Sequence, residues 1–178
     1  MLSNNSFRPG DIFFAGNGLS VEIGNSDAEG RLVLADALSL LIDERAPDVI
    51  IDIATLTGSC VATFGETVAA YLSNDEKTAG ALEDSSERTG EKIWRLPLFD
   101  DYDDRLKSDI ADLNNVSGEK NGGAIVGALF LKNFINETPW AHIDIAGTAW
   151  YSKGRGYNPK YATGFGVRLL VDLVQRWK

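Results

Sequence analysis

Two carboxylates and a guanidinium alternate with small residues in the segment Asn25-Ser26-Asp27-Ala28-Glu29-Gly30-Arg31. If this segment is extended, the side chains of Asp27, Glu29 and Arg31 point to the same side. Two converging carboxylates repel each other unless a cation compensates them, and their hard oxygen atoms suit Mg²⁺, Mn²⁺ or Zn²⁺. Arg31 cannot ligate a metal, but its fork of donors can hold an anion or a developing oxyanion. One hypothesis is therefore a metal site with an adjacent anion site.

The same residues also fit a purely structural role at the start of a helix. Apolar residues recur at helical spacing from Leu32 to Ile42, and Pro47 ends the run. Ser26 or Asp27 would then cap the helix, with Glu29 in its first turn and Arg31 in a salt bridge. The spacing alone does not decide between the two readings.

The elements around this segment are expected to alternate between strands and helices. A turn at residues 16–18 should join the apolar pieces 12–14 and 19–23 as a hairpin. Further strands are expected at 48–55, 67–72, 109–113 and 141–147, and helices at 75–89, 100–108, 122–134 and 167–177, with a loop at 151–166. This order predicts an α/β fold with layers, in which helices flank a mainly parallel or mixed sheet. No repeat or linker interrupts it, so residues 1–178 are expected to form a single domain.

Composition excludes several functional classes. The formal net charge of −9 and the absence of clustered Lys and Arg argue against a nucleic-acid partner. Cys60, the single cysteine, excludes an internal disulfide and fits a reducing compartment. No apolar run reaches membrane-spanning length, and the first residues lack the pattern of a signal peptide. We therefore expect a cytoplasmic protein with no membrane partner.

Several conspicuous polar and aromatic residues are expected to be structural. His142, Asp52 and Asp144 interrupt apolar strands, where burial requires hydrogen-bond partners. Asp144 is also placed to orient a loop of the site. The four tryptophans are spread along the chain, as packing residues are: Trp94, Trp140, Trp150 and Trp177.

The segment from Asn25 to Leu38 resembles the signature of the leucine (cytosol) aminopeptidase family, with Ser26 where threonine is usual. The similarity continues in the family's order through further blocks: 51–58, 94–98, 111–115, 122–124 and 140–149. The resemblance covers nearly the whole chain and identifies it as the carboxy-terminal part of the family's catalytic domain.

The resemblance implies a metal-dependent leucyl aminopeptidase. Such an enzyme removes N-terminal, preferably apolar, residues from peptides with water activated by two divalent ions, Mn²⁺ or Zn²⁺. By position, Asp27 and Glu29 would ligate the metals, and Arg31 would be catalytic by holding a bicarbonate-like anion that takes the proton of the attacking water. The residues implied to bind substrate are Asn25, Thr55, Leu56, Gly58, Asn115, Val116, Ala146 and Ala149.

The family's other metal-binding lysine and aspartates and its catalytic lysine belong to an upstream segment that nothing in this sequence matches. We therefore expect an incomplete metal site and no useful hydrolysis by this chain alone. The family's hexamers, with trimer-forming catalytic domains, imply a homo-oligomer. One alternative is a catalytically inactive assembly module of such a hexamer. Another, which sets the resemblance aside, is a phosphohydrolase that uses Asp27 and Glu29 for Mg²⁺ and Arg31 for phosphate.

Overall fold

The computed structural model describes residues 3, 6–119 and 121–177 and divides into two compact units. The first unit comprises Met1–Pro47 and Phe99–Glu137, and the second comprises Asp48–Leu98 and Thr138–Lys178. The expectation of a single domain stays a prediction.

A small sheet in the first unit leads into the segment with the candidate carboxylates. Strand β1 (Ile12–Phe14) pairs antiparallel with β2 (Ser20–Glu22), and β2 pairs parallel with β6 (Leu113–Asn114). The turn of the hairpin needs Gly18, whose φ of +89° lies in the left-handed region. The hairpin predicted around residues 16–18 is confirmed.

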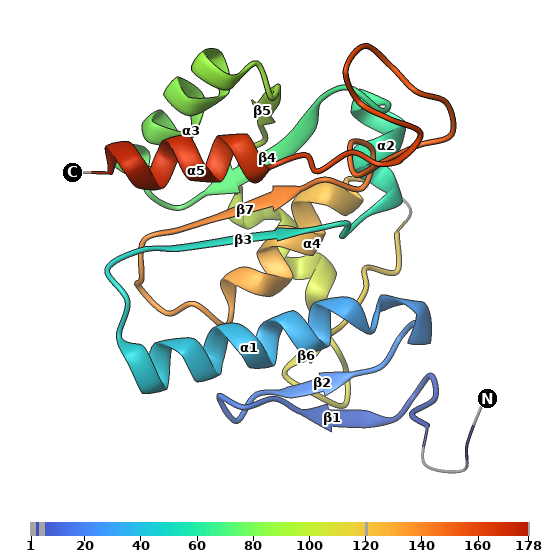
Figure 1. Cartoon of the computed structure of the whole chain (residues 1–178). Coiled ribbons are helices and arrows are strands. Elements are labelled where there is room, and N and C mark those ends of the chain that lie inside the picture. Colours follow the sequence, from blue (N-terminus) through green and yellow to red (C-terminus); the bar gives the residue numbers. More distant parts are fainter. Residues whose placement is uncertain (1–2, 4–5, 120, 178) are drawn as a thin grey trace. The chain divides into compact units, whose positions relative to one another are not determined.

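Two α-helices and a 3₁₀ helix pack together in the first unit (Figure 1). Helix α1 (Gly30–Arg45) packs against α4 (Gly123–Lys132), and the 3₁₀ helix η2 (Asp100–Leu106) packs against α4 as well. Helix α1 ends at Ala46, whose left-handed backbone (φ 43°) donates its N–H to the carbonyl of Ile42. The predicted amphipathic helix is therefore present, with Leu32, Ala35 and Leu38 on its buried face.

The second unit is built on a four-stranded mixed sheet in the order β3-β7-β4-β5. These strands are β3 (Ile50–Ala54), β7 (Trp140–Asp144), β4 (Ala69–Ser73) and β5 (Ile93–Arg95). The β3–β7 and β4–β5 pairs are parallel, whereas β4 and β7 run antiparallel. The expectation of an α/β fold with a mixed sheet flanked by helices is confirmed.

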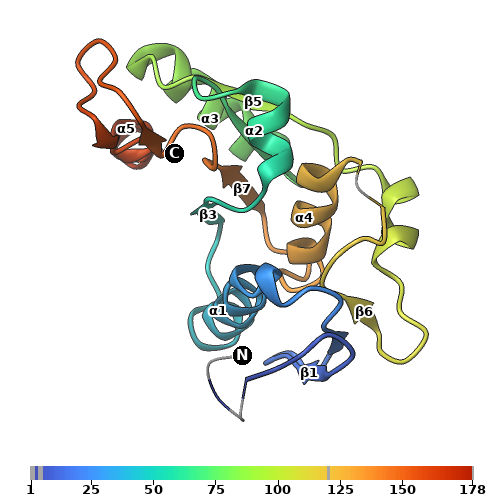
Figure 2. The same cartoon turned by 90° about the vertical axis from the view of Figure 1, so that its right-hand side faces the viewer.

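Helices α3 (Glu76–Thr89) and α5 (Val167–Arg176) lie side by side over this sheet (Figures 1 and 2). Their contact with the sheet forms an apolar core around Tyr71, Leu82, Ile143, Leu169 and Leu173. Burial of this apolar surface is the main stabilising contribution in the unit.

Some local predictions are wrong. Residues 25–31 are not extended: Ser26–Ala28 form a 3₁₀ helix (η1) and α1 begins at Gly30. The strand expected at 109–113 is displaced to Leu113–Asn114, because the Ser108 hydroxyl accepts the N–H groups of Ile110 and Ala111, both at 3.1 Å, in place of a strand partner. Short polar side chains that bond nearby backbone compete with extended structure in this way.

Three short elements and two tryptophans also differ from expectation. Helix α2 (Gly58–Phe64) was not predicted, nor was the hairpin of β8 (Trp150–Tyr151) and β9 (Tyr161–Ala162) inside the expected loop. Trp140 is fully buried, but Trp94 and Trp150 are 65% and 56% exposed and do not belong to the core. Within the described residues, no helix is long and apolar enough to cross a membrane.

Candidate functional site

The segment with the two candidate metal ligands is a helical turn that leads directly into α1. Asn25 caps this turn, because its side-chain oxygen accepts the N–H of Asp27 at 2.9 Å. The structural reading proposed Ser26 or Asp27 as the cap, and this prediction is wrong. Glu29 has helical backbone angles and precedes α1 without a side-chain capping bond. Asp27 and Glu29 thus lie at the amino-terminal end of a long helix, where the helix dipole favours negative charge.

Asn115 holds this segment in place from the other side of the unit. Its side-chain oxygen accepts the N–H groups of Gly24 (2.9 Å) and Asn25 (3.2 Å). Its side-chain NH₂ donates to the carbonyls of Asn25 (2.8 Å) and Ala28 (3.4 Å). The residue is fully buried, and its amide is occupied by these four bonds. Asn115 therefore orients the loop through its backbone.

Arg31 is tied to the same residue through a backbone atom. Its Nη1 donates to the carbonyl of Asn115 at 2.8 Å, and its guanidinium lies 6.0 Å from the centroid of the Phe130 ring. These contacts hold the cation near the start of α1. Val116, the next predicted site residue, lies beside Gly24, where an added Cβ would come within 2.8 Å of its methyl group.

The chemistry of Asp27 and Glu29 fits divalent metal ligands. Both residues are exposed, and neither carboxylate takes part in an ion pair or hydrogen bond within the described part of the chain. Hard oxygen donors of this kind suit Mn²⁺ or Zn²⁺. Among the described residues, no group of three or more His, Cys, Asp or Glu side chains is placed to hold a metal.

The other predicted substrate residues belong to the second unit, at the carboxyl ends of two adjacent parallel strands. Thr55 and Leu56 follow β3, and Ala146 follows β7. The Asp144 carboxylate joins the two loops: Oδ1 accepts the N–H groups of Leu56 and Ala146, both at 3.1 Å. This is the loop-orienting role expected of Asp144.

Thr57 extends this network into α2. Its hydroxyl donates to Oδ2 of Asp144 at 2.7 Å and accepts the N–H of Cys60 at 3.1 Å. Thr57 is thus the N-cap of α2, and Gly58 is the first residue of that helix. Sequence reasoning gave Thr57 no role, although a Thr followed by Gly-Ser after a buried strand is a capping signal.

The loop after β7 is compact. The N–H groups of Thr148 (3.0 Å) and Ala149 (2.9 Å) both donate to the carbonyl of Ile145. A Cβ on Gly147 would collide with the backbone carbonyl of Gly65, so this position requires glycine. The turn at Ile145 therefore fixes the backbone of Ala149, while the Asp144 carboxylate links Ala146 to the loop that follows β3.

Two buried groups lie outside the candidate site residues. The expected core position of His142 is confirmed: it is fully buried, with Nδ1 2.5 Å from Oδ1 of Asp52. Oδ2 of Asp52 accepts from Trp140 Nε1 at 2.7 Å. Burial and the nearby Asp144 charge raise the pKa of the Cys60 thiol to about 11, which removes its nucleophilicity at neutral pH.

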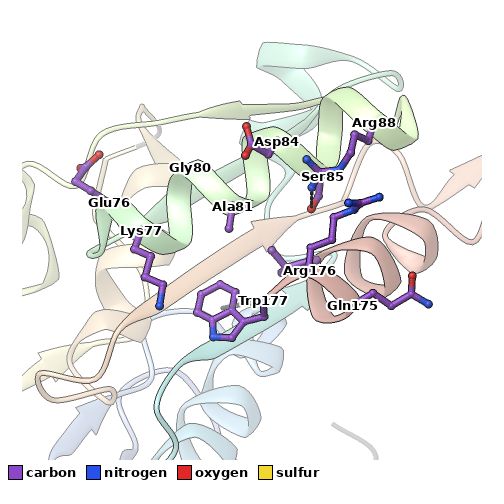
Figure 3. Close-up of a pocket in the computed structure, with 11 residues that line it drawn as sticks. Glu76, Lys77, Gly80, Ala81, Asp84, Ser85, Arg88, Gln175, Arg176 and Trp177 are labelled. Carbon is purple, nitrogen blue, oxygen red and sulfur yellow. Dashed lines mark hydrogen bonds between the residues drawn. The ribbon is translucent and has the colours of Figure 1, made fainter.

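A cavity of about 610 Å³ between α3 and α5 contains none of the predicted site residues (Figure 3). Three of its charged side chains are engaged with residues outside the lining, and Glu76 among them pairs with Arg95. Arg88 and Arg176 both bind Asp172, at 2.8 Å and 3.1 Å. The ammonium group of Lys77 lies 5.1 Å from the centroid of the Trp177 ring. This arrangement is a helix–helix contact and offers no chemistry of its own.

Comparison with known proteins gives a single answer. Residues 1–171 match the model of the cytosol aminopeptidase family, catalytic domain. The chain is 50% identical to a probable cytosol aminopeptidase of Geobacter sp. (strain M21) and 51% identical to one of Chlorobaculum tepidum. Each alignment covers 99% of the chain but 35% of the relative, so the chain spans about a third of these proteins. Among solved structures, the chain is similar to the bottromycin maturation enzyme BotP in complex with Mn, with 38% sequence identity and a TM-score of 0.89. The match covers 94% of this chain and 38% of the BotP chain.

Proposed function

Because the chain belongs to the cytosol aminopeptidase family, we propose that it is the carboxy-terminal part of a metal-dependent leucyl aminopeptidase. The observation that carries the proposal is the placement of Asp27 and Glu29. Both carboxylates are exposed, have no protein partner in the described residues, and are held at the start of α1 by the buried Asn115. The reaction is removal of the amino-terminal residue from peptides.

Asp27 and Glu29 would be ligands of two divalent ions, with Glu29 shared between them. Bound divalent ions supply Lewis acidity that polarises a peptide carbonyl and acidifies water. Manganese is favoured because the similar BotP structure is described as a complex with Mn, and zinc accepts the same ligands.

Arg31 would hold a small anion, bicarbonate-like in chemistry, that receives the proton released from water. Its guanidinium is always charged and presents several donors, and Nη1 donates to the Asn115 carbonyl. The start of α1 adds positive potential for such an anion. Asn25 and Val116, next to this segment, would contact the substrate.

The amino-terminal side chain of the substrate would lie against the loops after β3 and β7. Thr55, Gly58, Ala146 and Ala149 are small and carry no charge, which favours an apolar side chain. The Leu56 carbonyl would accept a hydrogen bond from the substrate or water. Its position is set by the bond between the Leu56 N–H and Asp144.

The chain by itself is proposed to be inactive, since Asp27 and Glu29 are too few ligands to hold two metal ions firmly. The test is calorimetric titration of the purified chain with Mn²⁺ and Zn²⁺, together with an assay of leucine p-nitroanilide hydrolysis. We expect weak metal binding and no hydrolysis. Tight binding of two ions with turnover would show that the remaining donors come from within this chain.

The same assay on the longer protein tests the activity itself. There Glu29→Ala should abolish turnover, whereas Glu44→Ala, an exposed carboxylate near the other end of α1, should leave it unchanged. A folded, metal-loaded longer protein without aminopeptidase activity would exclude the proposed function.

A cytoplasmic location and a homo-oligomeric state, trimer or hexamer in the longer protein, complete the proposal. The relatives are named cytosol aminopeptidases. In the four-stranded sheet, β3 and β5 are the outer strands, and outer strands offer unpaired backbone groups to further chain. Light scattering of the purified chain should therefore show self-association; a strictly monomeric, highly stable chain would contradict it.

A further inference from the structure

The hairpin after Ala149 has a charge opposite to that of the chain as a whole. The formal net charge is −9, yet no acidic residue occurs between Asp144 and Asp172. That stretch contains the cations Lys153, Arg155, Lys160 and Arg168. A local excess of one sign attracts ligands of the other sign to that surface.

At the base of this hairpin is a cavity of about 230 Å³. Three cationic residues line it: Lys92, which precedes β5, Arg155 in the hairpin loop, and Arg168 at the start of α5. Among the described lining residues the one carboxylate is Glu91. The lining therefore has a surplus of positive charge.

The Glu91 carboxylate offsets one of these three positive charges, because its ion-pair partner among the described residues is Arg168. It is 4% exposed; Oε2 accepts the N–H of Leu169 at 2.8 Å, and Oε1 lies 3.4 Å from Arg168 Nη2. The same Arg168 nitrogen donates to the Tyr157 hydroxyl at 2.5 Å, and the guanidinium covers the Tyr157 ring at 4.7 Å. These contacts hold the Arg168 guanidinium at the cavity, and its remaining N–H groups can donate to a ligand.

The positive charges of Lys92 and Arg155 are available to a ligand. Within the described residues neither side chain takes part in an ion pair or a hydrogen bond. The backbone at Arg155 is nevertheless fixed, because its N–H and carbonyl pair with those of Asn158, both at 3.0 Å. The cavity thus combines a defined backbone with two cations that have no ion-pair or hydrogen-bond partner among the described residues.

Thr163 connects this cavity to the proposed substrate pocket. It lines the cavity, its N–H donates to the carbonyl of Ala149 at 3.1 Å, and its hydroxyl donates to the carbonyl of Thr148 at 2.7 Å. A ligand in the cavity would therefore lie one residue away from the backbone of Ala149.

We propose that this cavity, lined by Lys92, Arg155 and Arg168, binds a carboxylate of the peptide substrate. The choice of a peptide rests on the proposed function. A carboxylate matches the planar fork of arginine and the small volume, and charge-assisted bonds are the strong ones in such a site. The carboxylate is either the chain end of a short peptide or an acidic side chain.

The test is a direct titration of the full ¹⁵N-labelled chain in metal-free buffer, followed by amide chemical shifts. The probes are N-acetyl-glycylglycine, with a terminal carboxylate; N-acetyl-glutamate amide, with a side-chain carboxylate; and the neutral N-acetyl-glycylglycine amide. Acetylation removes the amine, so that none of the probes can bind as an aminopeptidase substrate does. We expect saturable shifts at Gly154, Gly156 and Thr163 with a carboxylate probe and none with the neutral amide.

Arg155→Gln should weaken binding about tenfold, the change expected when one charge-assisted contact is lost. The matched control is Lys77→Gln on α3, which removes the same charge from an exposed position and should leave the affinity unchanged. Binding of the first probe alone assigns the site to the chain end, and binding of both assigns it to any peptide carboxylate.

Equal shifts with the neutral amide, no loss in Arg155→Gln, or an equal loss in Lys77→Gln would overturn the proposal. If Arg155→Gln disturbs the hairpin, Lys92→Gln replaces it as the deciding variant. Because no metal and no turnover are involved, this experiment fails or succeeds independently of the aminopeptidase assay.

Discussion

The side chain of Asn115 is bonded to both the carbonyl (2.8 Å) and the N–H (3.2 Å) of Asn25, a residue 90 positions earlier in the chain. This two-point contact fixes the start of the segment that contains Asp27 and Glu29. The Asn115 carbonyl also accepts from Arg31 at 2.8 Å. One buried residue therefore determines the placement of all three charged side chains.

Replacement of Asn115 by alanine should destabilise the first unit and loosen the Asn25–Arg31 segment. Loss of the amide leaves buried or half-buried backbone groups without partners, which costs about 1–3 kcal/mol. Urea denaturation followed by circular dichroism measures this cost, and the metal affinity of the variant in the longer protein should fall with it. Asn133→Ala is the control, since Asn133 is exposed and its side chain makes one hydrogen bond within the described residues, to the Leu129 carbonyl. Equal stability of the two variants would contradict the role of Asn115.

Asp144 and Thr57 should be energetically coupled. The Thr57 hydroxyl donates to Asp144, and both residues are buried. Asp144→Asn and Thr57→Val should each destabilise the chain, and the double variant should lose less than the sum, with a coupling of at least about 0.5 kcal/mol. The double-mutant cycle is measured by denaturation. Two results would contradict the loop-orienting role of Asp144. One is strict additivity of the two losses in the free energy of unfolding, and the other is an equal loss in Asp48→Asn, a change at an exposed residue.

The Cys60 thiol should be inert in the folded chain. Burial raises its pKa from 9.0 to about 11, with a further contribution from the Asp144 charge. Because the thiolate is the reactive form, modification by a disulfide reagent at pH 8 should be slow until the protein is unfolded. Since the folded pKa is the higher one, the stability that this group contributes is present below pH 9 and is lost as the pH rises towards 11. Rapid stoichiometric modification of the native chain would be the contrary result.

Asp172 should contribute stability that disappears in acid. Its hydrogen bonds from Arg88 and then Arg176 lower its pKa from 3.8 to about 2. A lowered folded pKa stabilises the protein above the ordinary value, and this contribution is lost as the pH falls towards 2. Asp172→Asn should therefore lower the melting temperature at pH 7 and have little effect near pH 2. Asp43→Asn, an exposed α1 carboxylate without an ion pair in the described residues, should show no such dependence.

The sequence was sufficient to predict the main helices and strands, because hydrophobic periodicity reports directly on which face is buried. The helical spacing after Leu32 marked α1, and the β-branched run after Asp48 marked β3. The sequence was not sufficient to predict the short helices and strands. Helix α2 depends on the Thr57 cap, and the β8–β9 hairpin depends on cross-strand pairing of Trp150 with Ala162, neither of which leaves a periodic signal.

The residue types at the candidate site, and the family to which the chain belongs, were likewise determined by the sequence alone. Asp27, Glu29 and Arg31 supply the same chemistry whatever their backbone conformation. Only the tertiary structure decided how they are held: as a helical turn bonded to Asn115, and not as an extended segment. The joining of the β3 and β7 loops by Asp144, and the cationic cavity beneath the hairpin, were decided in the same way. The physical reason is that hydrogen bonds between residues far apart in sequence follow from strand order and packing, on which local spacing carries no information.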